Sequence, residues 1–366
     1  MWAYAYSPFI DSTIWKRLYL TAWGAMKALY YDELKGFQGI KVGEFPIPEI
    51  AENEVLVKVK AFSLNHLDVW VMGGKYPVSV PLPHIFGSDA SGIIERAGTA
   101  VDHLKAGDEV ILFPGLSCGR CERCLSGRDN ECAGFSVLGV LTQGVSAEYA
   151  RVPAANIFKK PEGLTFEEAA GVGVTYTTAW NSLVLRAGIQ QGDTVLVHAA
   201  GSGAGSALIQ VAKLFNATII ATVGDDWKIA KAKDLGADFV INHRREDFAE
   251  SVKRITMGAL ADIAVDHVGG ATFNKSLSCL RRGGRLVTFG ATGGDEVPIS
   301  LRYVFGKNIT IHGVYVGPKA AMHHSLKLMP HKIRTVIDSV FEFSDAKKAY
   351  EKLLSRQFFG KIVVRV

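Results

Sequence analysis

The apolar positions from residue 192 onward fall into repeated pairs of a short aliphatic strand and an amphipathic helix. The first pair is a β-branched run at 194–197 and a helix at 206–215 whose apolar residues recur at helical spacing. The same reading gives strands at 218–223, 239–242, 261–265 and 285–290, and helices at 225–235 and 271–280. Strands that alternate with helices predict a parallel, doubly wound sheet with a ligand crevice at the carboxyl ends of its strands.

The residues before 173 have a different sequence pattern, which predicts short strands between glycine and proline turns. Residues 54–61 alternate between apolar and polar side chains, as in a strand with one solvated face. Further short strands are expected at 91–96 and 108–112. This part of the chain therefore predicts an antiparallel, barrel-like β domain.

The end of the chain predicts a helix at 344–354 and a final strand at 361–366. A strand placed after the α/β domain most economically rejoins the first sheet, so the β-rich domain is expected to be discontinuous. The predicted organisation is an N-terminal extension, a β-rich domain, a doubly wound α/β domain and a return to the β-rich domain, over residues 1–25, 26–172, 173–315 and 316–366.

Composition narrows the classes of protein that this chain can represent. The 366 residues are 48% hydrophobic and 21% charged, which suits two folded domains. The net charge of +5 is spread without a Lys or Arg run, so no nucleic-acid partner is expected. There is no apolar run of about 18 residues, and the Trp-rich segment 1–25 lacks the pattern of a signal peptide. We therefore expect a cytoplasmic protein without a membrane partner.

A turn of small residues joins the strand at 194–197 to the next helix. It reads Ala-Gly-Ser-Gly-Ala-Gly, so Ala200 and Ser202 stand at two glycine positions of the usual G-x-G-x-x-G pattern. Gly203 and Gly205 allow the backbone to approach a phosphate closely, and the free N–H groups at the helix start attract an anion. In this strand–turn–helix context, the turn predicts a site for the pyrophosphate of a dinucleotide.

Four of the five cysteines lie close together in one loop with the spacing C-x2-C-x2-C-x7-C. Four thiolates in this pattern suit a tetrahedral structural zinc ion whose shell is closed to substrate. An iron–sulfur cluster of ferredoxin type would place the fourth Cys sooner and follow it with Pro, whereas Ala133 follows here. Disulfides are not expected without a secretory signal. The expected zinc ligands are Cys118, Cys121, Cys124 and Cys132. Cys279 is expected in the core.

Residues 26–366 resemble the zinc-containing medium-chain dehydrogenase/reductase family, which includes alcohol dehydrogenases and quinone oxidoreductases. The resemblance rests on the four-Cys loop, the small-residue turn at 199–205, the segment Leu-Asn-His-Leu-Asp at 64–68 and the segment Lys-Ala-Lys-Asp-Leu-Gly-Ala at 231–237. It implies a Rossmann nucleotide domain joined to a GroES-like barrel domain. It also implies a homodimer or homotetramer, for which the β-prone segment 309–316 could supply an edge strand.

The chain departs from the alcohol dehydrogenases of that family at the catalytic zinc. The three ligand positions of the resemblance fall at Asn65, Ser88 and about Val174, and its proton relay falls at Leu67 and Trp70. None of these residues can replace a thiolate or imidazole ligand or relay a proton as the family does. Alcohol oxidation in the zinc enzymes needs a Lewis acid, whereas carbonyl, quinone or alkene reduction needs hydride and a hydrogen-bond donor. Reduction is therefore the favoured reaction.

Asn65, Asp68 and Asp89 are the candidate catalytic residues of the cleft. Asn65 is expected to contact either the nicotinamide ribose or the substrate. Asp68 and Asp89 could instead hold loops by accepting backbone N–H groups. A rebuilt metal site of His66, Asp68 and Asp89 is the alternative, although the resemblance places a basic residue at His66 against the pyrophosphate. Trp70 and Tyr176 are expected as walls of an apolar cleft.

The cofactor is expected to be NADP(H), with NAD(H) as the alternative. Selection for NAD uses an acid at the end of the second strand, where this chain has Val223. Lys228 and the basic pair at 244–245 favour a 2′-phosphate, whereas the acids at 225–226 oppose one. The expected cofactor-binding residues are His66, Thr178, Gly201, Ser202, Gly203, Ala204, Gly205, Thr222, Gly224, Lys228, His243, Gly290, Ala291 and Thr292.

These observations predict an NADP(H)-dependent reductase of carbonyl, quinone or enone compounds, with structural zinc, no catalytic zinc and an apolar cleft suited to bulky or aromatic small-molecule substrates. Two alternatives remain. One is an alcohol dehydrogenase with a rebuilt metal site, which would be sensitive to chelators. The other is a nucleotide-binding protein that has kept the fold and lost turnover, because a fold alone does not fix a function.

Overall fold

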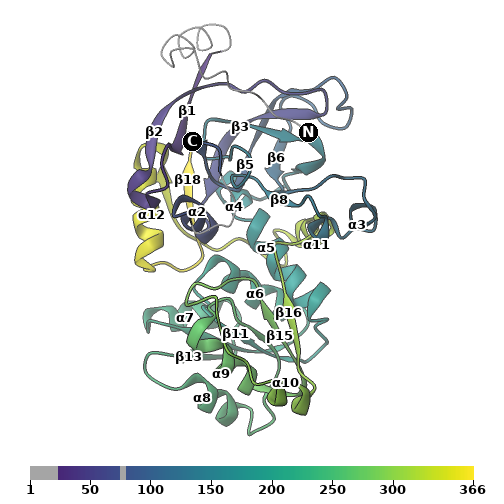
Figure 1. The fold of residues 1–366 in the computed structure, drawn as a ribbon, viewed down its shortest axis with the longest axis vertical. Coiled ribbons are helices and arrows are strands. Elements are labelled where there is room, and N and C mark those ends of the chain that lie inside the picture. The colour runs from purple at the N-terminus through teal and green to yellow at the C-terminus, as the bar shows by residue number, and fades with distance from the viewer. Residues whose placement is uncertain (1–23, 75–79) are drawn as a thin grey trace.

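The computed structural model describes residues 24–74 and 80–366, in two lobes stacked along the long axis of the molecule (Figure 1). The upper lobe is β-rich, and the lower lobe is built from alternating strands and helices. Residues 1–23, which form most of the predicted N-terminal extension, lie outside the described residues. Within the described residues, no helix has the length and apolar character that a bilayer crossing requires.

The lower lobe contains a six-stranded sheet in the order β13-β12-β11-β14-β15-β16, in which every pair of neighbours is parallel. Its central strands are aliphatic and buried on both faces, as a sheet covered by helices on both sides requires. In chain order the strands are β11 (Thr194–Val197), β12 (Thr218–Val223), β13 (Phe239–Asn242), β14 (Ala261–Val265), β15 (Leu280–Thr288) and β16 (Thr310–Gly313).

Helices connect these parallel strands. They are α6 (Gly203–Lys213), α7 (Trp227–Asp234), α8 (Phe248–Ile255), α9 (Phe273–Ser278) and α10 (Leu301–Lys307). The sequence did not lead us to expect a helix between Asn242 and Ala261, yet α8 forms there. Asp247 starts α8 by accepting hydrogen bonds from the N–H groups of Ala249 and Glu250.

The upper lobe is organised by a second sheet in the order β10-β6-β5-β3-β18-β17, with β9 also paired to β3. Its strands are β3 (Glu54–Ser63), β5 (Asp89–Ala97), β6 (Glu109–Leu112), β9 (Tyr149–Pro153), β10 (Ile157–Lys159), β17 (Ile337–Glu342) and β18 (Lys361–Arg365). The last strand, β18, runs antiparallel beside β3, so the end of the chain returns to the first lobe (Figure 1). The predicted fold class, a parallel α/β sheet with a discontinuous β-rich domain, is confirmed.

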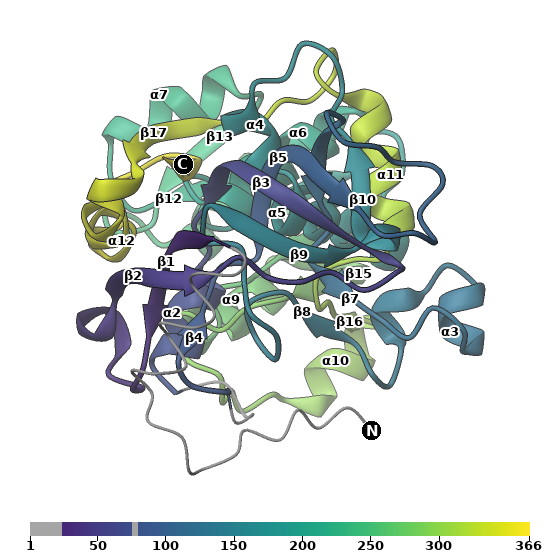
Figure 2. The same cartoon turned by 90° about the horizontal axis from the view of Figure 1, so that it is seen from above.

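Smaller elements surround this second sheet. Two small sheets contain β1 (Ala25–Tyr31), β2 (Lys41–Pro46) and β4 (His84–Ile85), and β7 (Gly115–Leu116) and β8 (Ser136–Val137). The helices are α2 (His66–Met72), α3 (Glu122–Leu125), α4 (Phe166–Ala170), α5 (Gly173–Trp180), α11 (Lys319–Leu328) and α12 (Ala346–Ser355), with a π-helical turn at Asn181–Arg186. Seen from above, α3 projects from the side of the molecule (Figure 2).

Two large apolar cores fill the lobes, and the second core crosses the boundary between them. It combines residues of the parallel sheet and α6 with two residues of the upper lobe, Ile111 in β6 and Phe113 directly after β6. At the same junction α5 packs against both α6 and α11 (Figure 1). The two lobes therefore share packed side chains at their junction.

Candidate functional site

A cleft of about 400 Å³ lies between the lobes, at the carboxyl ends of β11, β12, β14 and β15. Both lobes contribute to its walls. Twelve of the predicted site residues line it: Asn65, His66, Thr178, Gly201, Ser202, Gly203, Ala204, Gly224, Lys228, His243, Gly290 and Thr292. Asp68, Asp89, Gly205, Thr222 and Ala291 do not line this cleft, although Ala291 lines a neighbouring hollow that also contacts Trp70 and Tyr315.

The small-residue turn between β11 and α6 forms the floor of the cleft. The Oγ of Ser202 accepts a hydrogen bond from the N–H of Gly205 at 2.9 Å and so caps α6. A Cβ on Gly205 would lie 2.2 Å from the carbonyl oxygen of Ala199, so only glycine fits there. The other N–H groups of the first turn have no acceptor within the helix. This cradle fits an anionic pyrophosphate.

Thr222 supports the turn from beneath. Its side chain is buried, and its Oγ1 accepts a hydrogen bond from the N–H of Ala199 at 3.2 Å. Ala199 has a left-handed backbone, with φ of 49°, which the chain needs to enter the turn. The structure therefore places Thr222 behind the turn and not on its ligand face.

The end of the cleft beside β12 is lined by both acidic and basic side chains. Arg244 donates to the carboxylate of Asp225 at 2.6 Å, and both residues line the cleft. Lys228 is buried, and its Nζ donates to the carbonyl oxygen of Arg356 at 2.7 Å. Asp226 is held by Arg245 and by the side-chain amide of Asn242. Each acid after β12 is thus paired with a basic partner.

The carboxyl ends of β14 and β15 bring two rings together that the sequence reading did not select. The rings of His267 and Phe289 stack with centroids 4.7 Å apart, and both side chains line the cleft. Burial lowers the pKa of His267 to about 4, so this imidazole is neutral at pH 7. Phe289 lies near the end of the strand predicted at 285–290, and His267 lies two residues after the strand predicted at 261–265, so the rule that ligands bind at strand ends could have found both.

A buried cluster of polar side chains lies beside the cleft at Asn65. The side-chain amide of Asn65 donates from Nδ2 to Asp89 at 2.9 Å and accepts at Oδ1 from Nζ of Lys361 at 2.8 Å. Nζ of Lys361 also donates to the carbonyl oxygen of Leu64 at 2.9 Å and lies 3.3 Å from Asp89. Burial lowers the pKa of Lys361, and the carboxylates of Asp89 and Asp68 oppose that effect.

Asp89 is fully buried at the start of β5 and links three elements. Its Oδ1 accepts a hydrogen bond at 2.7 Å from the N–H of Val174, in the first turn of α5. A Cβ on Gly173 would lie 2.5 Å from the same oxygen, so this approach depends on glycine. Its Oδ2 faces Asn65 and Lys361. Asp89 therefore acts on the cleft through Asn65.

Asn65, Ser88 and Val174 stand at the three positions where the resemblance expects ligands of a catalytic zinc ion. The amide of Asn65 is engaged as described, and the Oγ of Ser88 donates to the carbonyl oxygen of Leu138 at 2.8 Å. Val174 presents an apolar side chain to the cleft. In the described part of the chain, the four-Cys loop is the one group of three or more His, Cys, Asp or Glu side chains close enough to share a metal ion.

Asp68 is buried in α2 and does not line the cleft. Its Oδ2 accepts hydrogen bonds from the N–H of Asn65 at 2.9 Å and from the hydroxyl of Tyr350 at 3.0 Å. These contacts secure the start of α2 and join it to α12. Burial raises the pKa of Asp68 from 3.8 to about 7. The structure thus gives Asp68 the loop-holding geometry that the sequence reading considered as the alternative to catalysis.

The two aromatic walls predicted for the cleft have different positions. Trp70 lines both the cleft and the neighbouring hollow. The prediction for Tyr176 was wrong, because its ring is buried and does not line the cleft. Its hydroxyl donates to the carbonyl oxygen of Arg334 at 2.6 Å and accepts from Gln210 at 2.9 Å. A helix has two faces, and Thr175 and Thr178 of α5 take the one toward the cleft.

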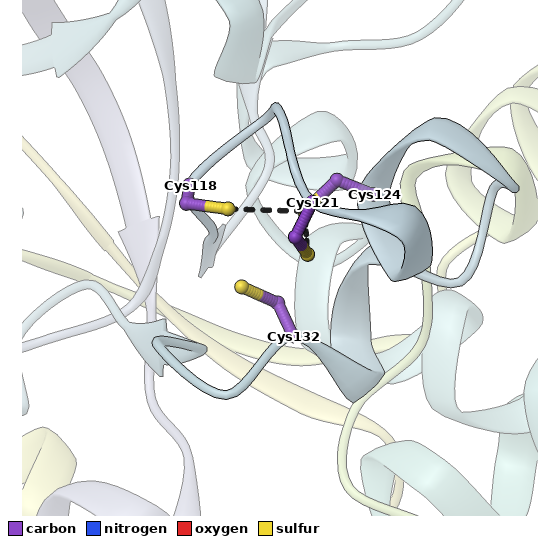
Figure 3. Close-up of side chains that lie close together, drawn as sticks. All are labelled: Cys118, Cys121, Cys124 and Cys132. Atoms are coloured by element: carbon purple, nitrogen blue, oxygen red, sulfur yellow. Dashed lines mark hydrogen bonds between the residues drawn. The ribbon is translucent and has the colours of Figure 1, made fainter.

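The four cysteines of the loop converge from two segments of chain (Figure 3). All four Sγ atoms lie within 4.8 Å of one another, and the Sγ of Cys124 is 3.9 Å from Cys118 and 3.6 Å from Cys121. Zinc–sulfur bonds of about 2.3 Å in a tetrahedron require sulfur separations of about 3.8 Å. Backbone N–H groups of Arg120 and Cys121 lower the pKa of Cys118 to about 6, whereas burial and hydrogen bonds with the neighbouring thiols raise the pKa of Cys121 to about 11. The loop fits a structural zinc ion.

Comparison with known proteins agrees with this geometry. The zinc-binding dehydrogenase family matches residues 203–331, and the alcohol dehydrogenase GroES-like domain family matches residues 51–162. An alcohol dehydrogenase of Geobacillus stearothermophilus is 33% identical over 93% of this chain and 100% of its own length. A human quinone oxidoreductase is 29% identical over 79% of this chain and 80% of its own. A solved structure described as an NAD-dependent alcohol dehydrogenase is 41% identical, with a TM-score of 0.90, over 93% of this chain and 100% of that one.

The environment of Asp68 generates a prediction about pH and stability. Between pH 4 and pH 7 the unfolded carboxyl is ionised while the folded one is still protonated, so unfolding releases a proton and stability falls as pH rises. Relative to Asp68→Asn, wild-type protein should lose roughly 2 to 3 kcal/mol of unfolding free energy between pH 5 and pH 8. Denaturant titrations of both proteins at the two pH values measure this difference. Parallel pH profiles would contradict it.

Proposed function

The chain belongs to the zinc-containing medium-chain dehydrogenase/reductase family and is an NAD(P)-dependent oxidoreductase, and from this premise we propose that it is an NADP(H)-dependent reductase. Its substrates are carbonyl, quinone or enone compounds, reduced by hydride transfer, with structural zinc and without a catalytic zinc. The observation that supports the proposal is the hydrogen-bonded cluster around Asn65, the position where the resemblance to alcohol dehydrogenases expects a catalytic metal ligand.

The residues of the cleft fit a nicotinamide dinucleotide, which supplies the hydride when bound. The capped start of α6, with Gly201, Gly203 and Ala204 on the cleft, would hold the pyrophosphate. Thr178 and the strand-end residues Gly290 and Thr292 would face the nicotinamide end. Ala291 and the supporting residues Gly205 and Thr222 complete the predicted cofactor region.

The choice of NADP(H) is supported by the charges after β12. Asp225 already forms an ion pair with Arg244 and lies 3.9 Å from Lys228, so the cleft there has two cations and one anion. The surplus cation would attract a 2′-phosphate, and Arg244 and His243 lie at the same wall as hydrogen-bond donors for it. The alternative is NAD(H), since Asp225 could accept from ribose hydroxyls and one solved relative is described as NAD-dependent.

The walls of the cleft support a reductive reaction on an apolar substrate. Trp70, Val174 and Tyr315 supply apolar and aromatic surface, while Asn65 and Thr178 supply polar groups. When hydride reaches a carbonyl or enone, negative charge develops on oxygen, and a fixed hydrogen-bond donor lowers that barrier. This chemistry requires no Lewis acid from the chain. The proton can come from water or from a polar side chain at the cleft.

Two alternatives have distinct consequences. An alcohol dehydrogenase with a rebuilt metal site would need ligands beside Asn65, and His66, Asp68 and Asp89 are not grouped closely enough in the described structure to share an ion. A non-catalytic nucleotide-binding protein would bind NADPH without transferring hydride to any acceptor.

We also propose a homodimer or homotetramer. The strand β16 is the edge of the parallel sheet, and one of its sides has no neighbouring strand within the described residues. Leu301 and Phe305 on the adjacent helix α10 are 74% and 69% exposed, which is high for large apolar side chains. Pairing of two β16 strands would cover this edge and bury apolar surface beside it.

The proposed activity is tested by following NADPH absorbance with purified protein and a panel of ketones, enones and quinones. We expect oxidation of NADPH with at least one class of acceptor, and faster rates with bulky or aromatic members, because the cleft walls are apolar. Tight NADPH binding without turnover on any acceptor would favour the non-catalytic alternative. Alcohol oxidation that disappears with a chelator would favour the rebuilt metal site.

The cofactor preference is tested with Arg244→Ala. Loss of one charged hydrogen bond to a 2′-phosphate should raise the KM for NADPH by roughly tenfold and change the KM for NADH by less than about threefold. Arg245→Ala is the matched control, because Arg245 pairs with Asp226 and does not line the cleft. A wild-type protein that prefers NADH, or equal effects of the two variants, would contradict the NADP(H) assignment.

A further inference from the structure

The cleft contains one buried cation that the proposed function does not yet use. Lys361 is the first residue of β18, and it is 4% exposed. Charged side chains are rarely buried to this extent unless they are paired, because removal from water costs several kcal/mol per ion. Its partner Asp89 is fully buried as well. A buried ion pair adds nothing to solubility or surface charge, so we expect this pair to have another role.

The hydrogen bonds of Lys361 leave nothing for a ligand. An ammonium group has three N–H donors. Its Nζ has three acceptors, which are the carbonyl oxygen of Leu64, Oδ1 of Asn65 and Oδ2 of Asp89. The ammonium group of Lys361 can therefore act on a ligand only through these partners. Leu64 and Asn65 both line the cleft, and of the three accepting groups only the side-chain amide of Asn65 carries N–H donors of its own.

The two charged partners fix which way the amide of Asn65 faces. An ammonium can only donate, so the atom of Asn65 beside Lys361 must be oxygen. A carboxylate can only accept, so the atom beside Asp89 must be the amide nitrogen. The chemistry of these two partners therefore decides the orientation of the amide. One N–H of Asn65 donates to Asp89, and the second has no acceptor among the described residues.

We propose that Lys361 and Asp89 are positioning residues that lock the amide of Asn65, so that its second N–H donates to the substrate oxygen that gains negative charge during hydride transfer. This inference rests on the proposed reductase function and names Asn65 as its catalytic hydrogen-bond donor. The hydride forms the new C–H bond, the electron pair of the π bond moves to oxygen, and water supplies the proton. Asn65 is not a proton source in this step.

The aliphatic part of the Lys361 side chain connects the hydrogen bonds of Asn65 with the phosphate-binding turn. A Cβ on Gly203 would lie 2.6 Å from Cδ of Lys361, and one on Gly171 would lie 3.3 Å from its Cγ. The stem therefore runs against the phosphate-binding turn while its head holds Asn65. A single side chain thus sets the distance between the site for the cofactor pyrophosphate and the donor for the substrate. Such fixed geometry is the source of electrostatic catalysis, since no reorganisation is needed during reaction.

The test is a double-mutant cycle between Lys361→Met and Asn65→Leu. Each single variant should lower kcat by about 10- to 100-fold and change the dissociation constant for NADPH, measured by fluorescence, by less than about threefold. Because Lys361 acts through Asn65, the double variant should be no slower than Asn65→Leu alone. Lys160→Met is the matched control, since Lys160 is a largely buried, ion-paired lysine outside the cleft and should leave kcat unchanged.

Two kinetic results would overturn the inference. If Lys361→Met weakens NADPH binding and leaves kcat unchanged, the lysine serves the cofactor. If the losses in kcat multiply in the double variant, Lys361 acts independently of Asn65. Asn65→Asp is a second probe should Lys361→Met fail to fold, because it retains an acceptor for Lys361 and removes the N–H donor. It should also lose kcat, and an unchanged kcat would contradict the assigned role.

A measurement without turnover separates this inference from the reductase proposal. In protein labelled with 15N-asparagine, the side-chain signal that vanishes in Asn65→Leu belongs to Asn65. In the wild type its two N–H protons should be resolved and at least one should exchange slowly with water, whereas Lys361→Met should speed that exchange. Rapid exchange in the wild type would overturn the lock even if the enzyme is active. If the protons exchange slowly in a protein that reduces no acceptor, the fixed orientation of Asn65 is supported and the proposed reductase function is wrong.

Discussion

The pairing of β18 with β3 is the contact on which the rest of the site depends. Val363 of the last strand lies opposite Ser63, which is the last residue of β3, and the chain continues directly into Leu64 and Asn65. This register brings Lys361 beside Asn65 although the two residues are 296 positions apart in the chain. A shift by one residue would turn Lys361 to the other face of the sheet, because side chains alternate along a strand. The last strand, β18, therefore completes a wall of the cleft that begins with the residues after β3.

Close packing links this buried charge to the cofactor site. Gly203 and Gly173 are both small where Lys361 and Asp89 approach, and any side chain there would meet a neighbour at 2.6 Å or less. Glycine at these two positions leaves room for the side chains of Lys361 and Asp89, just as glycine in the turn leaves room for a phosphate. The shared core across the junction keeps the lobes in register. Under the proposed function, this hydrogen-bonded cluster takes the place of a catalytic metal, and the fold fixes the positions of its charges.

The sequence predicts the parts of this structure that are local or periodic. The alternation of strands and helices predicted the doubly wound sheet, and the Cys spacing predicted the four-Cys cluster, because both patterns lie within short stretches. Lys361 could not be selected, since its partners Asn65 and Asp89 are almost the whole chain away and a lysine at a strand end is usually solvated. Tyr176 was misplaced because the period of one short helix does not show which face meets the cleft. Helix α8 was missed because its apolar stripe is short and its start depends on the Asp247 cap.

The central claim is that hydride transfer in this cleft is assisted by the hydrogen-bonded cluster of Asn65 and not by a catalytic metal. Zinc per chain, measured by elemental analysis before and after mild chelation, tests it directly when ketone reduction and alcohol oxidation are followed on the same samples. The account predicts one zinc ion per chain, held by the four-Cys loop, and reduction that is unchanged when weakly held metal is removed. Two zinc ions per chain, with activity lost as the second one leaves, would contradict it.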